Sequence, residues 1–230
     1  MFIEKESLYR RLTRFWHVFA AFTLLAVGFI VSQKQSSEDE LRNRHILGRG
    51  FYETLVFLLS ASINLGVAVW VSFPAGIIMF KTLDRHTFST VQSRLFPVYF
   101  ILVGVTAFLQ LSVVLSHKTL SLQLSGPDTI LVLSLAVEFL NGFLNGCFLG
   151  PWMAGILSKK IKMEKEEGVM PPMIGSRLGE NPEYKKLCKE FGMSHGISTL
   201  LNLGSFSGSI YVFYYISTEI FQLVEHCGLN

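Results

Sequence analysis

Charged residues are scarce in this 230-residue chain and are missing from long stretches of it. Asp, Glu, Lys and Arg make up 16% of the sequence, against roughly 25% in a typical soluble domain. Each long stretch approaches or exceeds the ~20 residues with which an α-helix crosses a bilayer. The pattern excludes a soluble globular enzyme, a disordered chain and a coiled coil, and it argues against an outer-membrane barrel. Five segments contain no charged residue except Glu138, namely 15–33, 54–80, 95–117, 129–158 and 191–218.

Cysteine is also rare, and the sequence signatures of soluble chemistry are missing. The three Cys have no short spacing, so they provide neither a disulfide framework nor a CxxC site. The six His show no HxH or HxxxH spacing, and no P-loop, GxSxG, HExxH or dinucleotide fingerprint occurs. We therefore expect no metal and no cofactor. We expect no nucleic-acid partner either, because the basic residues cluster at the ends of the apolar segments.

The apolar segments predict an all-α integral membrane helical bundle. We expect a core of four transmembrane helices over 51–218, with a loop at 159–190 and a tail at 219–230. Residues 1–50 are expected to hold a basic segment, one further transmembrane helix that acts as a signal anchor, and a polar loop. A cleaved signal peptide is the alternative for that first helix.

The distribution of Lys and Arg predicts the orientation. With five spans, the connecting pieces on one side carry 15 Lys and Arg, and those on the other side carry 5. The positive-inside rule places the N-terminus and the loops 81–94 and 159–190 in the cytosol. The C-terminus is then lumenal or extracellular. Because the sequence has no other sorting signal, we expect the secretory pathway, an endomembrane or the plasma membrane.

Proline residues predict where the helices bend or begin. Pro74 and Pro151 lie inside the second and fourth spans and are expected to kink them. Pro97 is expected in the first turn of the third span. Asn181 is expected to cap a short helix that leads into the last span. The sequence shows no convincing internal repeat.

Polar residues inside the apolar segments carry the most functional information. Such side chains are costly against lipid and should face the bundle interior. Glu138, Asn141 and Asn145 are spaced i, i+3, i+7 and share one helix face. Two interpretations stay open: the polar groups only hold helices together, or Glu138 is a proton relay or cation site. We predict a polar membrane seam made of Asn64, Gln110, Glu138, Asn141, Asn145, His195 and Asn202.

Glycine residues beside these positions predict close helix packing. Gly142, Gly146 and Gly150 repeat every four residues, as do Gly204 and Gly208. Small residues at this spacing let a neighbouring helix approach closely. We expect the fourth and fifth spans to pack together, with the polar seam between or beside them.

Two long stretches resemble a known family. Residues 70–100 read WVSFPAGIIMFKTLDRHTFSTVQSRLFPVYF, and residues 181–205 read NPEYKKLCKEFGMSHGISTLLNLGS. They resemble the signature region and the closing helix of the transmembrane protein 205 family. The resemblance covers about residues 50–218 and implies a four-helix membrane domain with both ends outside. The signature positions that it carries over are Arg85, His86, Phe88, Gln92, Phe96, Pro97, Asn145, Pro151, His195, Gly196 and Asn202.

The resemblance also implies a role, although it assigns no chemistry to these positions. The family is associated with resistance to platinum drugs, which implies export or vesicular sequestration. Residues 1–50 and the carboxyl group of Glu138 have no counterpart in the family pattern.

Three functions follow from these observations. The first is a membrane facilitator that exports a small molecule, a drug or an ion. The alternative is a membrane adaptor or vesicle-trafficking factor that acts through its cytosolic loops. The third is an intramembrane enzyme, which would need Glu138 and His195 at the same depth in the membrane. Because their two spans run antiparallel, we predict that these residues lie at different depths, and we expect no enzyme. The lipid bilayer is the expected partner, while a second copy of the chain and a cytosolic protein bound at 159–190 stay open.

Overall fold

The computed structural model describes residues 50–118, 126–169 and 177–226, and all regular structure in these ranges is helical. The first predicted span, at 15–33, lies outside the described residues. The last helix continues past residue 218, where we expected the core to end. In chain order the elements are α2 (Phe51–Trp70), the π-helix η3 (Val71–Ala75), α3 (Gly76–Thr82), α4 (Arg85–Lys118), α5 (Gly126–Leu144), the π-helix η4 (Asn145–Leu149), α6 (Gly150–Glu166), α7 (Arg177–Glu180) and α8 (Pro182–His226).

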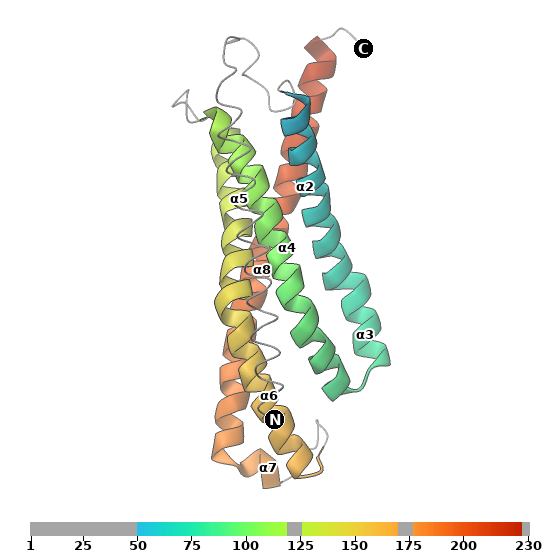
Figure 1. Cartoon of the computed structure of the whole chain (residues 1–230), viewed down its shortest axis with the longest axis vertical. Helices are drawn as coiled ribbons and strands as arrows, with labels where there is room; N and C mark the ends of the chain where they lie inside the picture. The colour runs from blue at the N-terminus through green and yellow to red at the C-terminus, as the bar shows by residue number, and fades with distance from the viewer. Residues whose placement is uncertain (1–49, 119–125, 170–176, 227–230) are drawn as a thin grey trace.

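The long helices form a ring of four. Helix α4 packs between α2 and α5, and α8 closes the ring by packing against α5, α6 and α2. Figure 1 shows α4 in front of α8, with α5 and α6 on one side and α2 and α3 on the other. The ring consists of two helix pairs. In the first pair α2–η3–α3 returns through α4, and in the second pair α5–η4–α6 returns through α8.

The first helix of each pair is interrupted by a π-helical turn beside a proline. Pro74 lies inside η3, and Pro151 follows η4 in the first turn of α6. A proline has no N–H to donate, and its ring clashes with the carbonyl group one turn earlier. A π turn accommodates it by inserting one extra residue into the helix. Each proline predicted to kink its helix therefore lies in or directly after a π turn.

The prediction for Pro97 is wrong. Helix α4 begins at Arg85, so Pro97 lies inside the helix and not in its first turn. The cause is Asp84, whose Oδ1 accepts a hydrogen bond from the backbone N–H of Thr87 at 3.0 Å and caps the helix start. Hydrogen bonds from Thr87 also lower the pKa of the Asp84 carboxyl. Only Leu83 and Asp84 remain as a turn between α3 and α4.

The closest helix crossing joins α4 to α5 at two glycines. A Cβ atom on Gly142 would lie 2.5 Å from the Cα of Gly104 and 2.7 Å from the carbonyl oxygen of Phe100. A Cβ on Gly104, by contrast, would lie at an ordinary 3.5 Å from the Cα of Gly142. Gly142 is therefore the position that lets the two backbones approach.

Large apolar side chains cover the outside of the ring, as expected for a bundle in a bilayer. Phe73, Phe80 and Leu200 are 51%, 68% and 70% exposed. By length and composition, three of the described helical segments suit a membrane span: Phe51–Thr82, Arg85–Leu115 and Gly126–Glu166. Helix α8 contains the predicted last span but is not among the three. Its uncharged stretch at 191–218 is interrupted by many Gly, Ser and Asn residues. The protein is an integral membrane helical bundle.

One end of the second pair projects beyond the first. The segment Gly126–Glu166 has 41 residues, which makes it about 60 Å long at ~1.5 Å per residue, roughly twice the ~30 Å of a hydrocarbon core. Figure 1 shows the end of α6, the short α7 and the start of α8 extending past the α3–α4 turn. We call this projection the α7 end. Asn181 caps α8 there, accepting hydrogen bonds from the N–H groups of Glu183 and Tyr184.

Candidate functional site

Glu138 is a carboxyl group buried at the centre of the ring. It lies on α5 and is 1% exposed. Its Oε2 accepts a hydrogen bond of 2.7 Å from the Nδ2 of Asn64 on α2. Its Oε1 has no hydrogen-bond partner among the described residues. This oxygen faces α8, since a Cβ atom on Gly208 would lie 3.2 Å from it.

A chain of amides continues from Glu138 along the same face of the second pair. Asn145 donates to the Oδ1 of Asn141 at 2.7 Å, and Asn141 donates to the Oδ1 of Asn202 on α8 at 3.3 Å. The hydroxyl group of Tyr99 on α4 donates to the same oxygen at 2.6 Å. We use the name polar seam for Asn64, Tyr99, Glu138, Asn141, Asn145 and Asn202. The seam brings together side chains from all four helices of the ring.

The hydrogen-bonding capacity of the buried polar groups is not filled. Besides Glu138 Oε1, three buried oxygens lack a partner among the described residues: Asn64 Oδ1, Asn145 Oδ1 and Gln110 Oε1. All four atoms are acceptors. Buried polar groups normally find a partner, because an unpaired one costs about 1–3 kcal/mol. A group of spare acceptors suits a ligand that supplies donors: a proton, a cation, water, or a solute with N–H or O–H groups.

Of the predicted members of the seam, Gln110 makes its hydrogen bond within its own helix, and His195 lies outside the bundle interior. Gln110 is buried, but its amide donates to the carbonyl oxygen of Thr106 on its own helix. His195 is exposed and stacks on Phe191 with the ring centroids 5.7 Å apart. The reason is rotational: Ser194 is the fully buried residue at this point of α8, and the next residue is turned by about 100° around the axis. Gly208 lies level with Glu138, thirteen residues from His195, or about 20 Å along α8.

The predicted glycines serve two different neighbours. Gly204 and Gly208 face α5, at Val137 and at Glu138 with Ser134. Gly142 and Gly146 face α4, where Gly146 lies 3.8 Å from the side chain of Phe100 as measured from an added Cβ. Gly150 belongs to neither contact. Its N–H donates to the Asn145 carbonyl oxygen within the π turn, so a Cβ would lie 2.6 Å from that oxygen.

A second buried polar cluster lies near the α7 end. Glu164 of α6 is 4% exposed. Its Oε2 is 2.8 Å from the Nε2 of His86 at the start of α4, and its Oε1 accepts a 2.6 Å hydrogen bond from the hydroxyl of Tyr184 at the start of α8. Burial, followed by the neighbouring Glu164 carboxylate, raises the pKa of the Tyr184 phenol. We call these three residues the end clamp, because they join both helix pairs.

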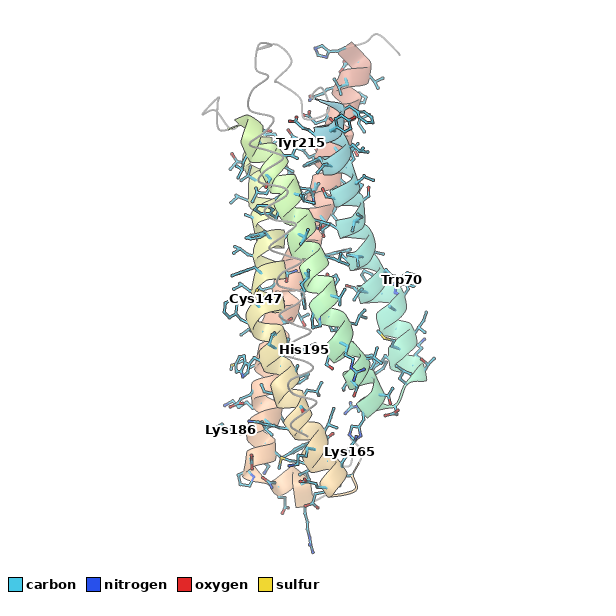
Figure 2. All side chains as sticks on the ribbon, in the orientation of Figure 1. Trp70, Cys147, Lys165, Lys186, His195 and Tyr215 are labelled. Carbon is cyan, nitrogen blue, oxygen red and sulfur yellow. The ribbon has the colours of Figure 1, made fainter. Side chains whose placement is uncertain are left out.

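The side chains labelled in Figure 2 mark the two ends of the bundle and the level between them. Lys165 and Lys186 lie near the α7 end, and Tyr215 lies near the opposite end. Trp70 and Cys147 lie between them at a similar level, one on each helix pair. Trp70 precedes η3 directly and Cys147 lies inside η4, so the two π turns sit at corresponding heights.

The remaining signature positions lie along α4 and α8, outside the polar seam. Arg85 is exposed, and Phe88 packs edge-on against Phe80 with centroids 5.8 Å apart. Phe96 stacks on Phe100 at 5.8 Å, and Gln92 is half-buried. Gly196 has open space where a Cβ would be. Among the described residues, no group of three or more His, Cys, Asp and Glu is arranged to hold a metal ion.

Several residues of the site were not predicted. Tyr99 and Gly104 lie within an apolar run without any pattern that singles them out. Tyr184 stands in the Asn-Pro-x-Tyr start of the last helix, which is the one signal that could have found it. Glu164 sits among six other charged residues in 159–167, a composition that is typical of a solvated surface.

Comparisons with known proteins agree with the resemblance seen in the sequence. The family described as Domain of unknown function (DUF4149) matches residues 59–162. The Danio rerio protein named Transmembrane protein 205 is 33% identical over 162 residues, which cover 66% of this chain and 85% of the zebrafish protein. No solved structure matches the chain. The identity of this match and the share of the zebrafish protein that it covers confirm the resemblance. The chain belongs to the transmembrane protein 205 family.

Proposed function

We propose that this protein is a facilitator that exports small solutes across a membrane, with the polar seam as its path. The observation that carries the proposal is the pair of interrupted helices. Each helix pair has a π turn with a proline at a corresponding height, and in each an Asn of the seam lies ten residues before that proline: Asn64 before Pro74 and Asn141 before Pro151. In transporters built from repeated halves, such interrupted segments flank the substrate site.

The contacts between the two pairs suit a rocking motion. Side-chain hydrogen bonds that link the pairs include Asn64 to Glu138, Tyr99 to Asn202, and His86 to Glu164. These bonds lie between the centre of the ring and the α7 end, so breaking them would loosen the contact between the pairs on that side of the seam. In the present conformation the seam is closed, since Asn141 and Asn145 are 0% exposed.

The chemistry of the seam favours solutes that donate hydrogen bonds or carry positive charge. Its spare atoms are acceptor oxygens, and Glu138 is its one carboxyl group. Ammine ligands of platinum compounds have this character, which agrees with the drug resistance that the family resemblance implies. We place the α7 end in the cytosol on the Lys and Arg distribution, with the membrane that of the secretory pathway or the cell surface.

The test is flux from proteoliposomes that contain the purified full-length protein. Protons, simple cations and a platinum-ammine compound would be assayed with wild type, Glu138→Gln and Glu166→Gln. Glu166 is the matched control, because its side chain is 63% exposed and pairs only with Lys162 at 3.6 Å in the described contacts. Flux that Glu138→Gln alone abolishes supports the proposal. Absence of flux in folded wild-type protein contradicts it.

A membrane adaptor is the second candidate, and the projecting α7 end favours it. Helices α6 and α8 extend past the rest of the bundle, and the end clamp fixes them there. Deletion of residues 166–180 should remove partner binding if the protein is an adaptor and leave flux intact if it is a facilitator. We do not propose an enzyme, because Glu138 and His195 lie at different levels.

A further inference from the structure

Three glutamates are buried in the described part of this bundle, Glu138, Glu164 and Glu219, and the first two have opposite surroundings. Glu164 offers both oxygens to strong partners, the ring nitrogen of His86 at 2.8 Å and the hydroxyl of Tyr184 at 2.6 Å. Glu138 has only neutral donors around it: the amide of Asn64 bonds its Oε2, and the Ser209 hydroxyl lies beside the carboxyl group, while Oε1 accepts no well-formed hydrogen bond from the described residues. Lys160 also lies beside the clamp, 5.7 Å from the ring centroid of Tyr184. The clamp therefore suits a carboxylate, whereas the surroundings of Glu138 do not.

No charged group compensates Glu138 at its own level. Phe108 packs against Phe139 and marks that level on α4, as Asn64 does on α2 and Gly208 on α8. From these positions the nearest charged residues along the four helices are Glu53, Lys118, Asp128 and Glu219, each ten or eleven residues away. That distance is about 15 Å along a helix axis. A buried carboxylate without a compensating charge is normally replaced by the neutral acid.

Two phenols on the neighbouring helices both donate their hydroxyl protons to other acceptors. Tyr99 on α4 donates to Asn202, and Tyr211 on α8 donates to the carbonyl oxygen of Pro127 at 3.0 Å. The hydroxyl of Ser209 beside the carboxyl donates to the Ser205 carbonyl at 3.2 Å. Ser209 is also close enough to act as a hydrogen-bond donor to the Glu138 carboxyl group, but it carries no charge.

A proton on Oε1 fits the hydrogen bonds of the carboxyl group. Oε2 remains the acceptor for the Asn64 amide, while a protonated Oε1 becomes a donor where an ionised one is an unpaired acceptor. The carbonyl oxygen of Ser134 lies in the same region, since it and Oε1 are each 3.2 Å from the position that a Cβ of Gly208 would occupy.

We propose that Glu138 is a proton-binding site, holding a proton on Oε1 in this closed conformation and releasing it when the seam opens, so that protons are exchanged during transport. The release step rests on the proposed transport function, whereas the bound proton does not. Opening the seam admits water to the carboxyl group, which removes the reason for its neutral state.

The test is infrared spectroscopy of the full-length protein in a detergent without ester groups, at neutral pH. Exposed carboxyl groups are ionised there, so a carboxylic-acid C=O band reports a buried acid. We expect a band that is lost in Glu138→Gln and kept in Glu164→Gln. The Asn64→Ala variant should shift the same band to higher frequency, because Oε2 loses its hydrogen bond; this variant decides the matter if Glu138→Gln does not fold.

The opposite results overturn the inference. A band that keeps its full intensity in folded Glu138→Gln and shows no shift in Asn64→Ala comes from another buried acid, such as Glu219, and means that Glu138 is ionised. A band that saturating Na⁺ removes means that the site takes a cation. Flux without the band would refute the proton site and leave transport standing, whereas the band without flux would leave the proton site and refute transport.

Discussion

Replacing Gly142 by Ala should destabilise the bundle more than any other single-methyl change at its glycines on α4 and α5. The added Cβ would lie 2.5 Å from the Cα of Gly104 and 2.7 Å from the Phe100 carbonyl oxygen. These are backbone atoms, so no side chain can rotate away, and the helices must separate by roughly 1 Å to reach ordinary carbon–carbon distances. Overpacking of this kind costs about 1–3 kcal/mol. The gain in helix propensity from Gly to Ala offsets up to about 1 kcal/mol of it.

We therefore expect a net loss of about 1 kcal/mol, and at most about 2 kcal/mol, in the free energy of unfolding. The measurement is far-UV circular dichroism during reversible unfolding in mixed micelles. Gly104→Ala is the matched control on the facing helix, because its Cβ would meet Gly142 at 3.5 Å. It should stay within about 1 kcal/mol of wild type. If the two variants were equally destabilised, or if Gly142→Ala were neutral, the described crossing of α4 and α5 would be refuted.

Three further predictions concern the helix ends and the clamp. Asn181→Ala should cost about 1 kcal/mol in unfolding free energy through loss of the α8 cap, and faster amide exchange in the first turn of α8 would check it. Asp84 has a folded-state pKa below its ordinary value of 3.8; the stability it contributes is complete above the unfolded pKa and is lost as pH falls through the folded pKa. Acidification below about pH 4 should thus destabilise wild type more than Asp84→Asn. An equal fall of the thermal midpoint with pH in the two proteins would contradict this. His86→Ala should lower the free energy of unfolding by about 1.5–3 kcal/mol, because it leaves the buried Glu164 with one partner fewer. An unchanged thermal midpoint would show that the end clamp does not stabilise the fold.

The sequence predicted the bundle because long uncharged segments are easy to recognise and because a bilayer forces such segments to be helical. Uncharged segments of more than 20 residues must be helices in a bilayer. The polar residues of α5 share one face because of the 3.6-residue period, so Glu138, Asn141 and Asn145 lie in one seam. The same periodicity gave a wrong prediction for His195, because the preceding residue, Ser194, is the one that faces the bundle interior.

Other features depend on contacts between distant segments, which periodicity does not encode. Gly104 is a lone glycine in an apolar run, and its role appears only where α5 crosses α4. Glu164 has the composition of a solvated helix end until the starts of α4 and α8 cover it. The correspondence of the two helix pairs was also missed, because apart from the common spacing of Asn64 to Pro74 and Asn141 to Pro151 the two segments differ in sequence.

The central claim is that the buried seam, and not the exposed surface, meets water when the protein works. A thiol-labelling experiment on α8 tests it with two isosteric substitutions at nearly one depth, Ser209→Cys on the seam face and Ser207→Cys on the exposed face. Both would be made after the native Cys residues are changed to Ser, and a membrane-impermeant thiol reagent would be applied to proteoliposomes. Because the thiolate is the reactive form and needs water, the account predicts that Cys at 209 reacts faster than Cys at 207 and that a transported solute slows it. No reaction at 209, whether or not 207 reacts, would show that the seam stays closed and that it only holds the helices together.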